Sequence, residues 1–581
     1  MPAGAARRSS FGEAINRRVL ALFMVFVLLL AGALARAVYL GLVKAPSLQL
    51  TAVRQQVSVV TIPALRGTIT DRNGVVLALS EAADEVIADP FLIAQPQKQA
   101  VALAPLLGLT QAQTYAGLTR PHTGYSILAR VVPVTQGDAI QQLRINGITV
   151  QPVLQRVYPR STLASQVVGW LGTQRNYDGG IEYLFNDQLA GRPGLRRTVY
   201  DAHGQPISVT TVRPMVPGST VGLTISAPLQ SEVEQVLARV GAEYSPKAAT
   251  AIVMNPDTGQ ILALGNWPAM NSNDVGATPL QSTEDYAVGL SYEPGSTFKA
   301  ITVAGALQDG LVTPSTEFDI PPYLDPYGRM ITDAEDHGYE WLTVAGILKY
   351  SSNIGADLIG QKMGASNFSS WVNRFGFGRP TGVELPGEQD GFILPLSQYS
   401  GVSMFNLPFG QGQEVTPIQM AAAYSAIADG GILRTPQIVQ SIGGHRAAEP
   451  KGKRVISPAV AAELRDMLRG VFADGGTASG AAIQGYDMAG KTGTAQIAVD
   501  GKYSSTEFVA SFIGMVPASD PKLVVAVVVN EPTKNSIYGG SVAGPAFQKI
   551  VGWAVPYLGI NPCPPQSPAS ACEDSATADS L

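Results

Sequence analysis

The chain has 581 residues, a length that predicts more than one domain, because a single hydrophobic core stops growing near about 250–300 residues. Hydrophobic residues make up 45% of the chain and charged residues 15%, which excludes disorder over most of its length. The formal net charge is −5 and no long basic run with interleaved aromatic residues occurs, so we expect no nucleic-acid partner.

The N-terminal segment predicts a membrane anchor. Four arginines precede the uncharged run Val19–Ala35, and further apolar residues follow as far as Lys44. At a rise of about 1.5 Å per residue, this segment can cross a hydrocarbon core of about 30 Å. The arginines predict a cytoplasmic tail over residues 1–18, a single span over 19–43 and an extracytoplasmic remainder. The alternative is a cleaved signal peptide, because Ala33-Leu34-Ala35 fits the small-x-small cleavage pattern.

Residues 44–224 are expected to form a β-rich domain, called the pedestal here. Short β-prone runs separated by turns recur in it, such as "GTITDRNGVVLALS" and "RINGITVQPVLQRVYP", and one helix is expected at about residues 97–107. The long amphipathic pattern "APLQSEVEQVLARVGAEY" then begins a segment of higher apolar content. We place a domain boundary near residue 225 and a second domain over residues 225–560.

Strand patterns lie at both ends of this second domain. "AATAIVMNPDTGQILALGN" predicts a hairpin, and residues 491–531 predict three more strands. Helix-period runs lie between them at 296–308, 343–363, 417–429 and 457–472. The pattern predicts a five-stranded antiparallel sheet built from both ends of the domain, with an inserted helical subdomain, in a layered α+β fold.

The final segment, residues 561–581, is rich in Pro, Ser and Ala and is expected to be disordered. The chain's 2 cysteines, Cys563 and Cys572, both lie in it, so we expect no disulfide in either domain. Whether these two cysteines are bridged stays open.

One lysine is unusual in the helical pattern at 296–308. The pattern is largely apolar, yet Lys299 lies in its first turn, three residues after Ser296. Side chains at this spacing share a helix face, so the two are expected to approach each other. A desolvated lysine can be neutral and can accept the proton of a serine hydroxyl, which predicts a serine nucleophile with a lysine base. Alone, this short Ser-x-x-Lys pattern is weak evidence.

Two further groups strengthen the prediction. "YSSNIG" supplies Ser351 and Asn353 just after a predicted helix. "MAGKTGTAQ" supplies Lys491, Thr492 and Gly493 at the start of the strand expected at the sheet edge. Ser-x-x-Lys, Ser-x-Asn and Lys-Thr-Gly in this order are specific in combination, because each has its own role in acyl transfer.

With these motifs the chain resembles a class B penicillin-binding protein, a membrane-anchored D,D-transpeptidase of cell-wall peptidoglycan. The resemblance extends from the anchor to about residue 560 and includes three segments similar to the family's pedestal motifs: "RGTITDRNG" (Arg66–Gly74), "RVYPRSTLASQVVGWLG" (Arg156–Gly172) and "GGIEYLFNDQLAGRPG" (Gly179–Gly194). It implies the serine transpeptidase fold, with a five-stranded antiparallel sheet flanked by helices, a dimerisation-like pedestal and one transmembrane helix.

The resemblance also implies a role for each motif residue. Ser296 attacks the carbonyl of the penultimate D-Ala of a stem pentapeptide while Lys299 accepts its proton, and D-Ala leaves. The backbone N–H groups of Ser296 and Thr494 form the implied oxyanion hole. Ser351 relays a proton to the leaving amine, and Asn353 binds the substrate backbone and steadies Lys299. The amine of a neighbouring stem then resolves the acyl-enzyme.

The Lys-Thr-Gly strand is implied to hold the terminal carboxylate of the substrate through Lys491 and the hydroxyls of Thr492 and Thr494, with Gly493 in the same binding group. No cofactor or metal is implied, because the 4 histidines fall outside the motifs and show no metal-ligand spacing. For the same reason a Ser-His-Asp triad is not expected. His337, in "DAEDHGYEW", is expected in a surface loop in preference to the cleft before Ser351.

Two other classes share parts of these motifs. A serine β-lactamase has the same three motifs, but it would lack the anchor and pedestal and would need a base that activates water, which the sequence does not identify. A non-catalytic sensor or scaffold of the same fold is the second alternative. The intact Ser296, Lys299 and Lys491 argue against it.

Within the family, two segments favour a division-type enzyme over the alternative, an elongation-type one. "LALSEAADEVIADP" and "YGGSVAGPAFQKIVGWAVPYLGI" are more similar to division-type sequences. The implied partners are peptidoglycan stem peptides on glycan made from lipid-linked precursors, β-lactams, divisome membrane proteins and a SEDS-family glycosyltransferase. The glycosyltransferase is included because no domain that polymerises glycan fits into residues 44–224, before the second domain, so another protein must make the glycan.

Overall fold

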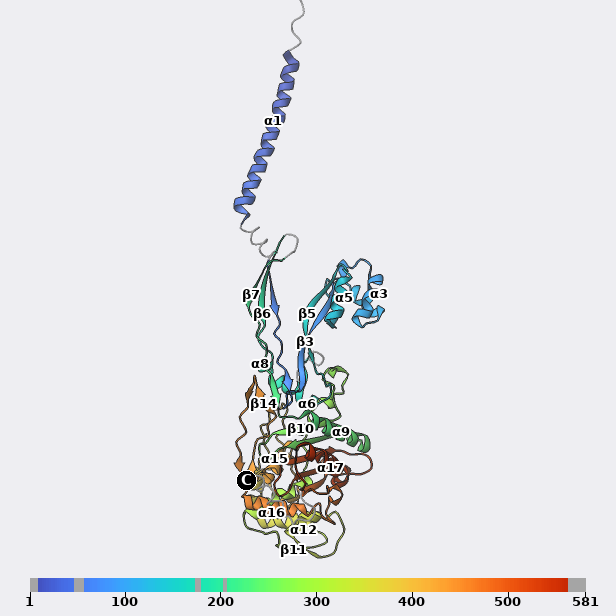
Figure 1. Ribbon diagram of the computed structural model, residues 1–581, viewed down its shortest axis with the longest axis vertical. Helices are drawn as coiled ribbons and strands as arrows, with labels where there is room; N and C mark the ends of the chain where they lie inside the picture. Colours follow the sequence, from blue (N-terminus) through green and yellow to red (C-terminus); the bar gives the residue numbers. More distant parts are fainter. Residues whose placement is uncertain (1–8, 46–56, 173–178, 202–205, 563–581) are drawn as a thin grey trace, which may run out of the picture. The chain divides into compact units, whose positions relative to one another are not determined.

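The computed structural model describes residues 9–45, 57–172, 179–201 and 206–562. The chain forms two compact units, one combining residues 1–64 with 192–216 and the other combining residues 65–191 with 217–581 (Figure 1). Residues 1–8 of the predicted cytoplasmic tail, the predicted disordered segment from residue 563 on, and both cysteines lie outside the described residues.

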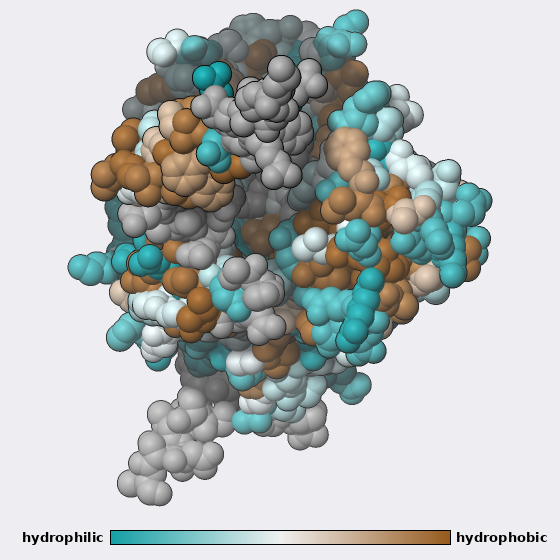
Figure 2. Space-filling view, turned by 90° about the horizontal axis from the view of Figure 1, so that it is seen from above, coloured by the Kyte–Doolittle hydropathy of each residue, from teal (hydrophilic) through white to brown (hydrophobic). Residues whose placement is uncertain are grey.

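The first unit contains the predicted anchor. Helix α1 (Ser9–Val38) continues into a π-helical turn, Tyr39–Val43, and the segment Asn16–Val43 is long and apolar enough to cross a membrane. Its large apolar side chains are exposed, as expected of a helix that contacts lipid. On the face shown in Figure 2, hydrophobic and hydrophilic residues are interspersed. The unit also holds an antiparallel sheet in the order β1 (Val57–Ile62), β6 (Gly194–Tyr200), β7 (Pro206–Arg213).

In the second unit, the pedestal residues and the later domain share one sheet. β2 pairs in parallel with β8, β8 pairs with β14, and β3 pairs with β4 and β5, so the sheet continues across residue 225. Its strands are β2 (Ile69–Thr70), β3 (Val76–Ala88), β4 (Ser126–Pro133), β5 (Ile148–Val157), β8 (Val221–Leu223), β14 (Val439–Ile442) and β15 (His445–Arg446). Three helices pack on β3 and β4 around a small core: α3 (Pro96–Leu107), α4 (Gln111–Leu118) and α5 (Val134–Gln142).

The three pedestal motifs meet at one buried carboxylate. Glu182 lies in α7 (Gly180–Leu184), between α6 (Ser165–Val168) and α8 (Asn186–Leu189) along the chain, and its side chain is 0% exposed. Arg66 and Arg156 each donate to it at 2.6 Å. Asp71, in the same motif as Arg66, accepts a hydrogen bond of 3.1 Å from the backbone N of Ala227 at the start of α9 (Ala227–Tyr244). The motifs therefore brace the pedestal internally and connect it to the next domain.

The second domain is built on the predicted antiparallel sheet, which is confirmed. Its order is β10 (Ile261–Trp267), β9 (Ala248–Met254), β19 (Leu523–Asn530), β18 (Lys502–Val516), β17 (Ala489–Val499), so strands from both ends of the domain pair and β17 lies at an edge. In β19, Val525 and Val527 pack in the same cluster as residues of α9 and α17 (Gly539–Tyr557), whereas Val524 and Ala526 pack with the inserted helices. Both faces of the sheet are thus covered, in the layers predicted.

The inserted region is helical, with short sheet segments. Its elements are α10 (Tyr286–Gly289), α11 (Lys299–Gln308), β11 (Glu317–Ile320), β12 (Glu340–Thr343), α12 (Val344–Tyr350), α13 (Asn353–Met363), α14 (Ala365–Arg374), α15 (Pro417–Ala428), β13 (Ile432–Leu433), β16 (Lys453–Arg454) and α16 (Pro458–Arg469). Local sequence defines several starts: Thr416 and Gln419 form a capping box before α15, and Ser457 caps α16.

Two predicted helices differ from the structure in their details. The run at 296–308 begins as a 3-10 turn, Gly295–Phe298, and the α-helix starts only at Lys299. The run at 343–363 is two helices, because Ser351 adopts a left-handed conformation with φ 63° that ends α12 before α13 begins. Both differences lie at the predicted site.

Candidate active site

The Ser-x-x-Lys segment packs directly against the Lys-Thr-Gly strand. A Cβ atom added at Gly493 would lie 3.0 Å from Cγ2 of Thr297 and 3.1 Å from the carbonyl oxygen of Pro294. Gly295 has φ +53°, and a Cβ atom there would lie 3.1 Å from that of Ala495. Glycine at both positions therefore lets the two backbones approach closely, which brings the turn carrying Ser296 beside β17.

The turn around Ser296 is held by buried neighbours. Thr297 Oγ1 donates to the carbonyl of Pro294 at 2.7 Å, and Tyr424 Oη donates to the carbonyl of Thr297 at 2.7 Å. Phe298 packs its ring against Phe377 with centroids 5.2 Å apart. Ser296 itself is partly exposed, and its hydroxyl has no hydrogen bond to any described residue. A rigid turn thus presents a free hydroxyl.

Lys299 is fully buried and contacts the Ser-x-Asn segment. Its Nζ donates to the carbonyl oxygen of Ser351 at 2.5 Å and to Asn353 Oδ1 at 2.8 Å, and it lies 3.3 Å from Ser351 Oγ. Among the described residues, all its hydrogen-bond partners belong to this segment. Burial lowers the pKa of Lys299 to about 7, although the carboxylates of Asp333 and Asp357 oppose the shift. A large share of this amine is therefore neutral at neutral pH.

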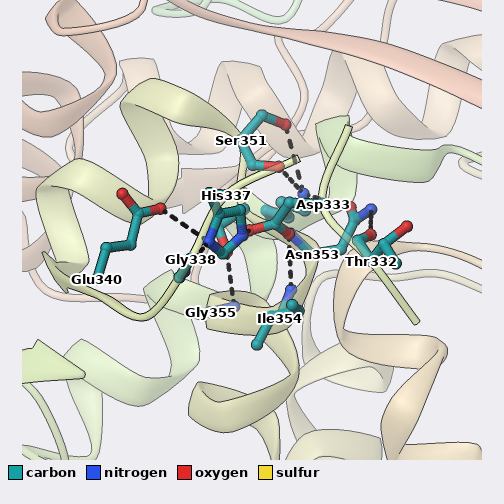
Figure 3. Close-up of polar contacts among 11 residues, drawn as sticks. Thr332, Asp333, His337, Gly338, Glu340, Ser351, Asn353, Ile354 and Gly355 are labelled. Carbon is teal, nitrogen blue, oxygen red and sulfur yellow. Dashed lines mark hydrogen bonds and ion pairs between the residues drawn. The ribbon is translucent and has the colours of Figure 1, made fainter. Parts of the chain in front are cut away.

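Asn353 is oriented by the loop between β11 and β12. Its Nδ2 donates to the carbonyl of Thr332 at 2.9 Å (Figure 3). Its Oδ1 therefore faces Lys299. At the start of α13, Asp333 Oδ1 accepts from the backbone N of Asn353 at 2.5 Å and from that of Ile354 at 3.0 Å. Asp333 thus supplies acceptors for the first turn of this helix.

Asp333 and His337 were not among the predicted site residues. His337 lies in a loop, as expected, but its side chain is only 16% exposed, and its Nε2 lies 3.2 Å from Asp333 Oδ2. One signal could have indicated that an acceptor is needed here: the first backbone N–H groups of α13 have no partner within the helix. The N-cap Ser352 satisfies only the N–H of Gly355. The sequence does not reveal which distant residue supplies it.

The Lys-Thr-Gly residues line the edge strand β17. Lys491 is fully buried, and its Nζ donates to the carbonyl of Thr492 at 3.2 Å. Burial, and next the charge of Lys299, hold the pKa of Lys491 well below its ordinary value. Thr492 Oγ1 lies 2.9 Å from that of Thr477, and Thr494 Oγ1 accepts from the backbone N of Gly539 at 2.9 Å. An anion placed near Lys491 would favour its charged form.

Two further carboxyls, one buried and one partly buried, lie near the predicted site residues. Asp357, in α13, is fully buried, and neither of its carboxylate oxygens has a hydrogen-bond partner among the described residues. Burial raises its pKa to about 8, although the charge of Lys299 opposes the shift. Glu293 accepts from the backbone N of Gly412 and from the hydroxyl of Tyr503, and burial raises its pKa to about 7. Within the described parts of the chain, no cluster of His, Cys, Asp and Glu could hold a metal ion.

Comparison with known proteins identifies the family. The penicillin binding protein transpeptidase domain matches residues 249–552, and the penicillin-binding protein dimerisation domain matches residues 61–223. The chain is similar to the probable peptidoglycan D,D-transpeptidase PenA of Neisseria meningitidis, with 30% identity over 96% of this chain and 95% of the relative. For the peptidoglycan D,D-transpeptidase FtsI of Escherichia coli, the identity is 30% over 96% and 94%.

Among solved structures, penicillin binding protein 3 of Mycobacterium tuberculosis complexed with ampicillin matches with a TM-score of 0.68 and 28% identity, over 88% of this chain and 99% of that one. The chain therefore belongs to the class B penicillin-binding proteins, a family of peptidoglycan D,D-transpeptidases.

Proposed function

We propose that this chain cross-links peptidoglycan stem peptides through an acyl-enzyme formed on Ser296. The observation that carries the proposal is the free hydroxyl of Ser296, presented on a rigid turn beside β17 and one helical turn before the buried Lys299. A serine nucleophile needs a neighbour that takes its proton, and an amine with a pKa of about 7 is suited to that role at neutral pH.

In the first half-reaction, Lys299 accepts the hydroxyl proton while Ser296 Oγ attacks the penultimate D-Ala carbonyl carbon. The backbone N–H groups of Ser296 and Thr494 stabilise the oxyanion. Ser351 then passes a proton to the leaving amine as the C–N bond breaks and D-Ala departs. The 3.3 Å separation between Lys299 Nζ and Ser351 Oγ supports this relay.

In the second half-reaction, the amine of a neighbouring stem attacks the acyl-enzyme ester, and Ser296 regains its proton. Asn353 binds the substrate backbone in both halves. The terminal carboxylate of the donor stem is held by Lys491 with the hydroxyls of Thr492 and Thr494, in the binding group that includes Gly493. Burial lowers the pKa of Lys491, and a carboxylate bound beside it would restore the charged amine that the role requires.

The same hydroxyl is proposed to bind penicillins covalently. The solved complexes of the tuberculosis relative with ampicillin and aztreonam support binding of β-lactams by this chain.

We further propose the septal, division-type role, because two segments are similar to division-type sequences. The proposed partners are a SEDS-family glycosyltransferase and divisome membrane proteins. The four arginines before the apolar run Val19–Ala35 support an N-terminus in the cytoplasm and a catalytic domain outside the membrane.

Labelling with a fluorescent penicillin tests the proposal. The full-length protein is expected to form a covalent adduct, and Ser296→Ala is expected to lose it while melting at the wild-type temperature. Ser291→Ala, a serine change in the same segment, is the matched control and should label normally. Equal labelling of Ser296→Ala would contradict the assignment. Rapid β-lactam turnover would favour a β-lactamase, and a folded wild type that never labels would favour a scaffold.

A further inference from the structure

The loop between β11 and β12 contacts the Ser-x-Asn segment through both backbone and side chain. Asp333 accepts from two backbone N–H groups at the start of α13, and Thr332 accepts from the Asn353 amide. The same amide presents its oxygen to Lys299. A displacement of this loop would therefore change the position of Asn353 relative to Lys299.

His337 holds this loop through both of its ring nitrogens. Nε2 lies 3.2 Å from Asp333 Oδ2, and Nδ1 lies 2.6 Å from the carbonyl oxygen of Gly338 and 3.5 Å from Glu340 Oε1 (Figure 3). Each of these partners is an acceptor. A neutral imidazole carries one N–H, so only the imidazolium donates to both sides at once.

We propose that Asp333 and protonated His337 are positioning residues for acyl transfer: the imidazolium fixes the Asp333 carboxylate, which fixes the first turn of α13 and thereby aligns Asn353 and Ser351 on Lys299. The inference rests on the proposed function, because the alignment has a catalytic consequence only if Lys299 is the base. Neither residue touches the substrate in this scheme. Both act through Asn353.

The charges around this pair set the sign of its pH dependence. Burial lowers the pKa of His337. The hydrogen bond to Gly338 and the carboxylates of Asp333 and Glu340 together raise this pKa by more, so the net shift is upward. The pKa of His337 in the folded state thus lies above its pKa in the unfolded state. The stabilisation of the folded state by protonated His337 is complete below the unfolded-state pKa and is lost as pH rises through the folded-state pKa.

Asp333 also faces charges on the two helices behind it. Its carboxylate favours the charged form of Lys299 on α11 and disfavours the charged form of Asp357 on α13, and Arg329 acts on Asp357 in the opposite direction. Removing the charge of Asp333 therefore lowers the pKa of Lys299 further. This shift reports the charge of Asp333 near Lys299, whereas a fall in the maximal rate reports the alignment of Asn353.

The test measures acylation of the full-length protein by a fluorescent penicillin from about pH 6 to about pH 9, the range in which histidine ordinarily titrates and above it. Asp333→Asn and His337→Gln are expected to lower the maximal rate constant by about 10-fold to 100-fold, because small misplacements of catalytic groups cost that much. Asp333→Asn should also move the acid limb to lower pH. The wild-type rate constant should decline at the alkaline end of this range, because His337 loses its proton there. His337→Gln should lack this decline.

The matched control is Glu335→Gln, an exposed carboxylate of the same loop, which should keep the wild-type rate and profile. The double variant should be slower than wild type by less than the product of the single effects, because the two residues act on one contact. If Asp333→Asn fails to fold, His337→Gln alone decides. Wild-type rates and profiles in the variants that fold would overturn the positioning role. Persistent labelling of Ser296→Ala would instead overturn the proposed function, so the two failures are distinct.

Discussion

The amine of Lys299 lies 2.8 Å from Oδ1 of Asn353, an oxygen that can only accept a hydrogen bond. The carbonyl of Ser351 is a second pure acceptor, at 2.5 Å. A neutral amine has two N–H groups and one lone pair, so it can donate to both of these acceptors while its lone pair faces a hydroxyl, and Ser351 Oγ lies 3.3 Å away as the third neighbour. Ser-x-Asn therefore fixes the position of the Lys299 amine through three contacts.

Lys299→Ala should fold and lose acylation by about 10²–10⁴-fold, the usual contribution of a general base. The wild-type acylation rate should also rise with pH through about 7, because the lowered pKa makes the amine neutral above that value. Stopped-flow labelling across pH measures both effects. Lys362→Ala, which removes an exposed lysine, is the control. A wild-type rate in Lys299→Ala would mean that another group takes the proton.

Asp357→Asn should stabilise the protein at alkaline pH. The folded-state pKa of about 8 lies above the ordinary value, so the folded state holds its proton more tightly than the unfolded state, and stability falls as pH rises between the two values. An amide in place of this acid removes that loss, by about 1 kcal/mol or more. Chemical denaturation at two pH values measures the change.

The same substitution bears on catalysis, because ionised Asp357 favours the charged form of Lys299. Below its pKa of about 8 this carboxyl is protonated, so Asp357→Asn should leave the acid limb of the acylation profile near pH 7 in place and change the rate only at more alkaline pH. Asp474→Asn, at an exposed acid, should change neither stability nor profile. An unchanged pH dependence of stability in Asp357→Asn would show that this carboxyl does not titrate in the range given.

Gly493→Ala should reduce acylation more than it reduces stability. The added methyl group would press on Ser511, Thr297 and Pro294, which separates the Ser296 turn from β17. Overpacking of this kind costs about 1–3 kcal/mol, whereas the rate depends on the alignment of the same two segments. Labelling rate and thermal melting are compared with those of Gly289→Ala, where a methyl group meets no atom within 4 Å. Equal, small losses of labelling rate in both variants would argue that the close contact between the Ser296 turn and β17 is not critical for acylation.

The sequence predicted the central sheet because its strands show local signals, β-rich runs joined by turns at 254–261 and 499–502. It predicted a helix after Ser296 from apolar periodicity, but periodicity does not distinguish a first 3-10 turn from an α-turn. The break at Ser351 depends on one left-handed residue, which a periodic pattern also misses. Asp333 was missed because its contacts to α13 join residues about twenty positions apart, for which a single sequence holds no periodic signal.

Arg66→Glu tests the role of the pedestal motifs separately from the chemistry. Glu182 is fully buried between Arg66 and Arg156, so charge reversal places two carboxylates together and should destabilise the pedestal by about 3–5 kcal/mol. The proposed catalytic residues all lie in the later domain, so penicillin labelling should persist at temperatures where the pedestal has become sensitive to protease. Limited proteolysis with parallel labelling measures this separation. Arg160→Glu, at an exposed arginine in the second motif, should leave both properties unchanged. If labelling and protease resistance of Arg66→Glu disappear together, the pedestal and the transpeptidase domain unfold as one cooperative unit, in keeping with the sheet that they share.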